Sequence, residues 1–254
     1  MKTTLIKSIC VAVVGLLMVP CTASSQVIVD VSDSAGSTSD WLGFMNVFEL
    51  LNNGDASTAK GNFIFGSGWG VPDLVANFDD GNNKLRLLPN SVSDPNEFWY
   101  QNTSGMASDP TNPGGPGQLG NKYMEANLFQ AFGNGTAELA ALQADGTLQF
   151  DGEIATNTLT DAHVGSIYIR EFTPDFSTNV ETRIAATPGV FSISHTLQGL
   201  GGEVQYGFTV EGENVWITDV DPFGNIAIHT VPEPGSALLL TLAAAGICSR
   251  RRRS

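Results

Sequence analysis

Short segments rich in β-branched and aromatic residues, separated by turn signals, make up most of the chain between residues 26 and 231. In the segment 204–210, apolar and polar residues alternate strictly, which indicates a strand with one buried and one solvated face. Turn sequences such as Asn-Asn-Gly, Asp-Gly-Asn-Asn and Ala-Asp-Gly stand between the segments. The predicted strands are 27–31, 41–51, 62–65, 84–88, 97–101, 125–132, 147–159, 164–172, 180–186, 190–197, 203–210, 214–219 and 225–230.

This spacing of short strands predicts an all-β domain, an antiparallel two-sheet β-sandwich with jelly-roll topology and little helix. A parallel β-helix is the alternative, but it requires a short regular repeat and the sequence shows none. Residues 210–215 are interpreted as a hairpin connection between two strands. The segments 30–40 and 106–120, rich in Gly, Ser, Asp, Pro or Asn, are interpreted as surface loops.

Both ends of the sequence differ from this pattern. Lys2 and Lys7, the apolar stretch 9–19 and the small residues at 23–25 have the three-part layout of a secretory signal peptide, 1–25, which signal peptidase would remove. Lipidation at Cys21 is disfavoured by the preceding Pro20. A permanent membrane helix is disfavoured because the apolar stretch is short.

At the other end, a Pro-Glu-Pro motif precedes an apolar run, 236–248, and a cluster of arginines. Proline ends regular structure, the apolar run predicts a short hydrophobic helix, and the arginines would hold its end at the cytoplasmic face. An ordinary tail anchor is the alternative. The motif residues are Val231, Pro232, Glu233, Pro234, Arg250, Arg251, Arg252 and Arg253.

In this order, the three features resemble the PEP-CTERM sorting signal, here 232–254. The resemblance implies export across a Gram-negative-type envelope, processing by exosortase, and at least transient membrane contact through the C-terminal helix. More faintly, the segments 41–49, 66–70, 97–100, 204–208 and 214–216 are similar to planctomycete-type PEP-CTERM proteins of unknown activity. That similarity implies a shared fold and export, and supplies no catalytic residue.

The predicted body, 26–231, is acidic and contains no cysteine. Of the 12 Lys and Arg residues, two precede residue 26 and four follow residue 231, and of the 26 Asp and Glu residues only Glu233 lies in these end segments. The body therefore has six basic and 25 acidic residues, a net charge of −19. Such a surface disfavours binding to nucleic acid or anionic lipid. It also suits solubility, divalent counterions or a saline habitat.

Few residues suggest chemistry. His163, His195 and His229 are far apart in sequence, so ordinary hydrogen-bonded side chains are favoured over a zinc site. Asp151 and Glu153 are spaced to face the same way on one strand, and with a further acid across a cleft they could serve a glycosidase. Such pairs also arise by chance in an acidic chain.

Calcium is favoured over zinc, because two acidic turns, 79–83 and 219–225, offer hard oxygen ligands. The candidate ligands for a structural Ca²⁺ are Asp80, Asp219 and Asp221. Turn formation alone also explains Asp, Asn and Gly at these places.

Aromatic residues suggest contact with sugars. Trp99, Tyr100 and Trp69 are candidates for stacking on glycan rings, whereas tryptophans such as Trp41 and Trp216 are the kind that fill a sandwich core. We therefore expect a non-enzymatic cell-surface or matrix protein associated with exopolysaccharide, with glycan binding as its activity. A secreted carbohydrate-active enzyme is the alternative, and self-association as an adhesin is left open.

Overall fold

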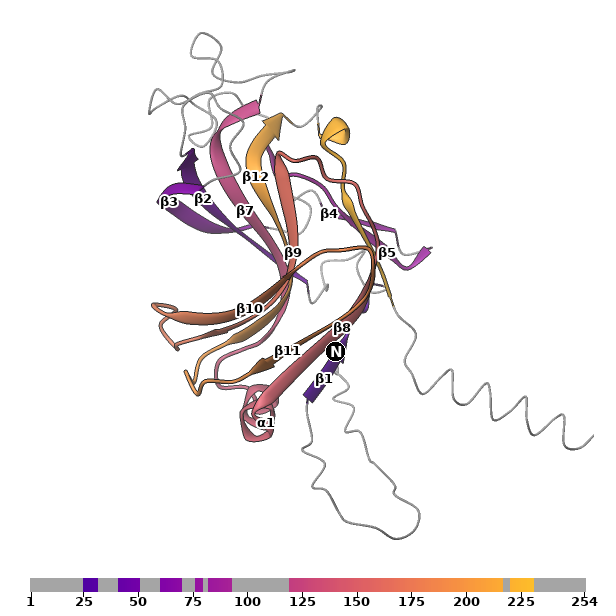
Figure 1. The fold of residues 1–254 in the computed structure, drawn as a ribbon. Coiled ribbons are helices and arrows are strands. Elements are labelled where there is room, and N and C mark those ends of the chain that lie inside the picture. Colours follow the sequence, from indigo (N-terminus) through magenta and orange to yellow (C-terminus); the bar gives the residue numbers. More distant parts are fainter. Residues whose placement is uncertain are drawn as a thin grey trace, which may run out of the picture.

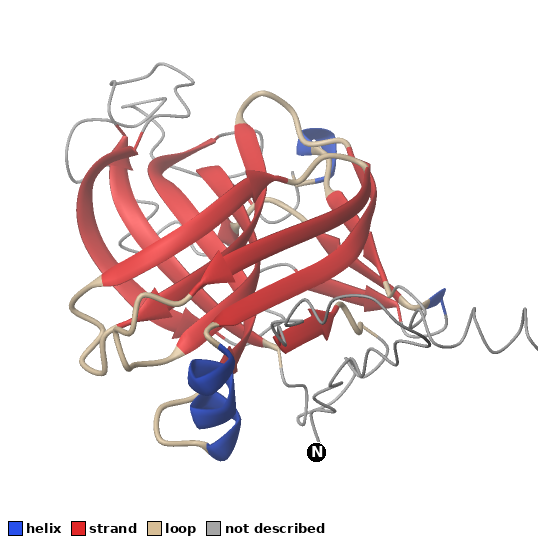
Figure 2. Ribbon diagram, turned by 60° about the horizontal axis from the view of Figure 1, so that its bottom comes forward, coloured by secondary structure: helices blue, strands red, loops and turns tan. Residues whose placement is uncertain are grey.

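The computed structural model describes residues 25–31, 41–50, 60–69, 76–79, 82–92, 119–216 and 220–230. Within this part, almost all regular structure is β (Figures 1 and 2). The strands are β1 Ser25–Ile28, β2 Leu42–Leu50, β3 Lys60–Trp69, β4 Ala76–Asp79, β5 Lys84–Leu87, β6 Ser91–Val92, β7 Leu119–Phe132, β8 Thr147–Asn157, β9 His163–Phe172, β10 Asn179–Ala185, β11 Gly189–Thr196, β12 Val204–Trp216 and β13 Ile226–His229. The helices are α1 Ala137–Asp145 and a 3₁₀ turn, Asp221–Phe223.

The strands form two sheets. Sheet A has the order β1-β8-β13-β5-β4, with β11 also paired to β8, and sheet B has the order β10-β9-β12-β7-β2-β3, with β6 paired to β12. Pairing is antiparallel except between β1 and β8 and between β6 and β12. The predicted all-β class and the two largely antiparallel sheets are confirmed. The jelly-roll connectivity stays a prediction, and the predicted signal peptide and C-terminal helix lie outside the described residues.

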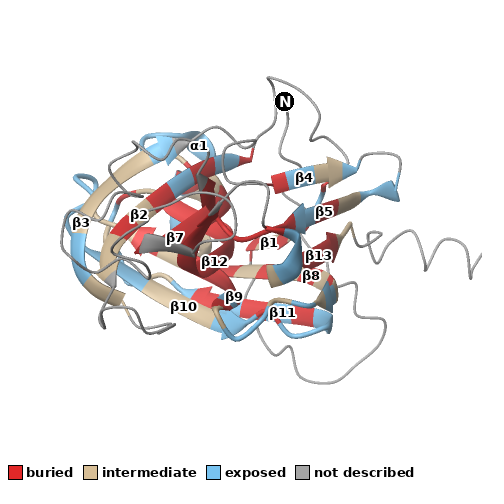
Figure 3. Ribbon diagram, turned by 90° about the horizontal axis from the view of Figure 1, so that it is seen from above, coloured by how far each residue is buried: buried red, intermediate tan, exposed pale blue. Residues whose placement is uncertain are grey.

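The main apolar core lies between the two sheets, where the buried strand segments of Figure 3 meet. Phe150 of β8 is fully buried, and its ring centroid lies 5.2 Å from that of Tyr206 and 5.7 Å from that of Phe208 on β12. Trp41 also belongs to this core, and its indole N–H donates to the carbonyl of Asp30 at 3.1 Å. The strict alternation in 204–210 therefore predicts the core-facing side of β12 correctly. The other side, predicted to be solvated, is buried as well, because Gln205 and Thr209 are at most 9 % exposed.

A helix interrupts the strands where none is predicted. Thr136 caps α1 by accepting a hydrogen bond from the backbone N–H of Leu139, and Gly146 ends the helix with a φ of 75°. Leu139 and Leu142 are buried against the main core. The turn signal at 144–146 is thus the end of a helix, which its Ala-rich sequence and its Thr and Gly caps favour.

The predicted hairpin at 210–215 is wrong, because β12 runs without interruption from Val204 to Trp216. It pairs with β7 as far as Glu213, and a bulge follows between Glu213 and Val215. Gly212 lies within the strand and pairs with Met124 of β7 and His163 of β9. A larger residue does not fit there, because the carbonyl oxygen of Ala162 lies 2.4 Å from the ideal Cβ position. Two acidic residues beside a glycine are typical of a turn, but here both carboxylates belong to a buried polar face.

Candidate functional site

The face of sheet B that points away from the main core is polar. On β12, Phe208 and Val210 point into the core, whereas the alternating residues Thr209 and Glu211 point to the opposite face. The register places Asn127 and Glu125 of β7 opposite these two residues, on the same face. Thr209, Glu211, Asn127 and Glu125 are all at most 6 % exposed. This face is therefore a second packed layer, built from hydrogen-bonding and charged groups.

Six charged side chains of this face form a closed ring of alternating sign, the ion-pair ring. It contains three cations and three anions, supplied by β3, β7, β9, β10 and β12. The contacts run from Lys60 Nζ to Glu125 at 2.6 Å, from Glu125 to Arg170 at 3.3 Å, from Arg170 to Glu181 at 2.5 Å, from Glu181 to Arg183 at 2.5 Å, from Arg183 to Glu211, and from Glu211 back to Lys60 at 2.7 Å. Its formal charge is zero, in a chain with a net charge of −14.

The ring shows how strongly sheet B is curved. Neighbouring strands lie about 4.8 Å apart, so β3 and β12, three spacings apart in the sheet, would be about 14 Å apart if it were flat. Nevertheless, Glu211 of β12 contacts both Lys60 of β3 and Arg183 of β10, which belong to the opposite edges of the sheet. The edges curl toward the same side in Figure 1. We call this polar face the concave face.

The electrostatics of the ring keep its best-buried carboxylate ionised. Burial favours the neutral form of Glu125, but Lys60, Arg170 and Arg183 outweigh it and lower the pKa of Glu125 to about 2. Burial likewise opposes the charge of Lys60, yet Glu125 and Glu211 raise its pKa above the usual value. A carboxylate held this way at neutral pH cannot donate a proton, so Glu125 is unsuited to the role of general acid.

Several polar atoms of the concave face have no partner. Asn127 Oδ1, Thr209 Oγ1 and the hydroxyl of Tyr168 are buried and make no hydrogen bond. Burial raises the pKa of Tyr168, so this hydroxyl keeps its proton. The guanidinium carbon of Arg170 lies 4.7 Å from the centroid of the Tyr168 ring. Unsatisfied groups of this kind are natural places for water or for ligand hydroxyl groups.

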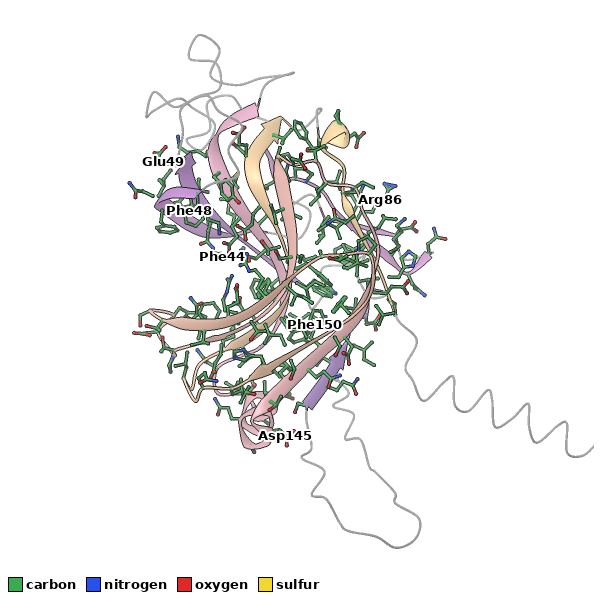
Figure 4. The ribbon with its side chains drawn as sticks, viewed as in Figure 1. Phe44, Phe48, Glu49, Arg86, Asp145 and Phe150 are labelled. Carbon is green, nitrogen blue, oxygen red and sulfur yellow. The ribbon has the colours of Figure 1, made fainter. Side chains whose placement is uncertain are left out.

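Apolar side chains border the polar groups on the β2 and β3 half. Phe44 and Phe48 of β2 lie on the concave side in Figure 4, while Phe150 lies between the sheets. Phe48 packs edge-on against Phe63 of β3 at 5.7 Å, and Lys60 Nζ lies 5.1 Å from the Phe48 centroid. Phe44 and Phe63 are 37 % and 59 % exposed. This combination of open aromatic side chains and polar groups suits binding of a ligand with both characters.

The side chains of the three predicted glycan-binding residues all lie outside the described part of the structure. Trp69 is the last residue of β3, in register with Gly43 of β2, and its side chain lies outside the described part. Trp99 and Tyr100 also lie outside the described residues.

The predicted calcium ligands are described only in part. Asp221 is exposed at the start of the 3₁₀ turn, and Asp80 and Asp219 lie outside the described residues. In the first acidic turn, Asp79 accepts a hydrogen bond from the Asn82 amide at 2.7 Å, which is ordinary turn chemistry. Structural calcium therefore stays a prediction.

The predicted carboxylate pair lies on β8, whereas the three histidines lie on three other strands. Asp151 and Glu153 share the outer face of β8, as predicted, and Asp151 accepts hydrogen bonds from the amides of Gln26 and Gln149. His163 bonds the carbonyl of Glu213, His195 bonds Thr182, and His229 lies on β13. Among the described residues, no group of three His, Cys, Asp or Glu side chains could hold a metal ion.

The ion-pair ring is absent from the sequence-based prediction. Its signal is the alternation of polar residues on strands whose other face is apolar, as at Glu125 and Asn127 on β7. Which carboxylate meets which cation depends on strand order and sheet curvature, and a single sequence contains neither. At Glu211, moreover, the predicted turn concealed the signal.

The comparison with family models identifies the C-terminal segment. Residues 230–253 match the model of the PEP-CTERM protein-sorting motif. No curated protein and no solved structure matches the chain. Within the described residues, none of the helices has the length and apolar character needed to span a membrane. The sorting signal nevertheless marks the protein for export to the cell envelope with processing by exosortase, and the chain is a PEP-CTERM sorting domain-containing protein.

Proposed function

We propose that this protein is a non-enzymatic component of the cell surface or extracellular matrix that associates with exopolysaccharide in a Gram-negative-type envelope. The observation that carries the proposal is the sorting motif at residues 230–253. It directs the two-sheet domain to the outside of the cell, where secreted polysaccharide is found. Signal peptidase would act on the N-terminal segment and exosortase on the C-terminal one.

The concave face of sheet B supports binding rather than catalysis. Its carboxylates are engaged in ion pairs, and the pKa of Glu125 is lowered to about 2. A glycosidase needs one carboxyl group that holds a proton near neutral pH. The arrangement at Glu125 favours the ionised form instead, which is consistent with a protein that retains polymer without cleaving it.

The export step is tested by replacing Pro232, Glu233 and Pro234 with alanine in the producing cells. We expect the variant to keep its C-terminal segment, which is seen as a larger band on an immunoblot, and to remain with the membrane fraction. A strain without exosortase should show the same band for the wild type. Normal processing and release of the alanine variant would contradict the role of the motif.

The polysaccharide step is tested by affinity electrophoresis of the exported protein in gels that contain the producing cells' own extracellular polysaccharide. Saturable retardation is expected. Loss of retardation with a chelator would support the proposed structural calcium at Asp80, Asp219 and Asp221. Migration unchanged by the polymer, with and without calcium, would refute the polysaccharide association while leaving the export result intact.

A further inference from the structure

We infer that the β2 and β3 half of the concave face binds a strand of uncharged polysaccharide, with one sugar ring stacked on Phe44 beside Gly68. This inference rests on the proposed association with exopolysaccharide and assigns it a site and a class of polymer. It concerns residues other than the tryptophans and the tyrosine singled out from the sequence.

The register of β2 and β3 creates an open platform. Phe44 is in register with Gly68, and Asn46 with Gly66. The Phe44 ring lies against Gly66, since an ideal Cβ there would be 3.1 Å from Phe44 Cε1. At Gly68 the nearest atom to such a Cβ is the carbonyl oxygen of Gly43, 4.0 Å away. Gly66 therefore lets the Phe44 ring lie against β3, and Gly68 leaves room beside that ring which a larger residue would fill.

The surroundings of the platform match the two faces of a sugar. The C–H groups of a pyranose pack on an aromatic ring, while its hydroxyl groups need donors and acceptors. Phe44 is 37 % exposed and Leu42, two residues along the same face, is 52 % exposed. Next to Phe44 in register lies Asn127, whose amide donates to the Phe44 carbonyl at 3.3 Å and whose Oδ1 has no partner. Lys60, with 32 % of its side chain exposed, adds a donor.

Charge favours an uncharged polymer over an acidic one. The three cations of the concave face that form the ion-pair ring, Lys60, Arg170 and Arg183, are neutralised there by Glu125, Glu181 and Glu211. The chain as a whole has a net charge of −14. An acidic polysaccharide would therefore be repelled at long range and would find no unpaired cation in the ring at short range.

A sugar chain fits this place better than an added β-strand. β3 is an edge strand, which could in principle pair with a further strand. However, the β2–β3 register shifts twice, between Val47 and Phe48 and between Phe48 and Leu50. Such irregularities twist an edge and disfavour continued pairing. The platform at Phe44 and Gly68 lies on the face of the sheet. A sugar ring stacked there does not depend on hydrogen bonds with the backbone of the edge strand.

The test uses the exported protein and the producing cells' polysaccharide, separated on an anion exchanger into an uncharged and an acidic fraction. Binding of each fraction is measured by affinity electrophoresis for the wild type, Phe44→Ala and Gly68→Leu. Gly68→Leu fills the platform without removing a packed side chain, so it keeps the test decisive should Phe44→Ala fail to fold. Val190→Leu is the matched control, because Val190 is 80 % exposed on β11 of the other sheet.

We expect the wild type and Val190→Leu to bind the uncharged fraction equally, and Gly68→Leu to bind it at least tenfold more weakly. Wild-type affinity in both platform variants would overturn the inference and leave the proposed function standing. Binding to the acidic fraction alone would overturn the assignment of an uncharged polymer. No binding of either fraction by the wild type would overturn the inference and the polysaccharide association together. A change in oligomeric state of Gly68→Leu, with polymer binding unchanged, would reassign the platform to self-association.

Discussion

Removal of Lys60 is the most direct perturbation of the ion-pair ring. Lys60 Nζ contacts Glu125 at 2.6 Å and Glu211 at 2.7 Å, and these two carboxylates are directly opposite each other on β7 and β12. Lys60→Met keeps most of the aliphatic side chain but leaves two like charges, each at most 6 % exposed, without the cation that they share. Arg170 and Arg183 would remain as partners of one carboxylate each.

The expected cost follows from burial and from the pKa of Glu125. Removing one partner of a buried ion pair costs roughly 3–5 kcal/mol, and the partial exposure of Lys60 reduces this to about 2 kcal/mol. The pKa of Glu125 is lowered from 4.5 to about 2 even though burial raises it, and this net lowering corresponds to about 3 kcal/mol, supplied by all the cations near it together. For a domain of this size, about 2 kcal/mol lowers Tm by roughly 4–8 °C.

The pH dependence gives the sign of the effect. Because the folded pKa of Glu125 lies below its unfolded value, its ion pairs stabilise the wild type above pH 4.5, and this stability is lost as the pH falls from 4.5 toward 2. In Lys60→Met much of it is already absent at pH 7. The difference in unfolding free energy between wild type and variant should therefore shrink toward pH 2.

Urea unfolding of the exported protein, followed by tryptophan fluorescence between pH 7 and pH 2, measures this difference. Arg86→Met is the control, because Arg86 is exposed on β5 outside the ring and its loss should change stability by less than about 0.5 kcal/mol. A Lys60→Met protein as stable as the control at pH 7, or a difference that stays constant with pH, would refute the reasoning.

Three further predictions test the fold and the proposal that the protein is not an enzyme. Gly207→Ala should destabilise the protein severely, by more than about 3 kcal/mol, because the new Cβ would lie 2.1 Å from the carbonyl oxygen of Leu128; a normal thermal unfolding curve would contradict this. Thr136→Ala should cost about 1 kcal/mol in urea unfolding through loss of the helix cap on Leu139, whereas Thr136→Ser should cost little. Reducing-sugar assays on polysaccharide panels should show no release by the wild type, and release that Glu153→Gln abolishes would instead establish the enzymatic alternative.

Local patterns in the sequence predict the strands and the buried sides of several of them. On β8, the alternation around Phe150 identifies the face that packs against Tyr206 and Phe208. The local pattern misleads where the same residues suit both a turn and a strand. Gly212 between two glutamates predicts a turn, but pairing with Met124 of β7 and His163 of β9 keeps it in a long strand. Tertiary contacts there override the local preference.

The sequence by itself determined the export signal, the all-β class and the acidic character of the body, because each depends on residues close together in the chain or on composition alone. Only the tertiary structure decided that three of the six cations of that body would meet three carboxylates in one ring. Lys60 and Arg183 are far apart in sequence and belong to opposite edges of sheet B, yet both reach Glu211. The reason is physical: strand order and sheet curvature bring them together, and those arise from the packing of the whole domain.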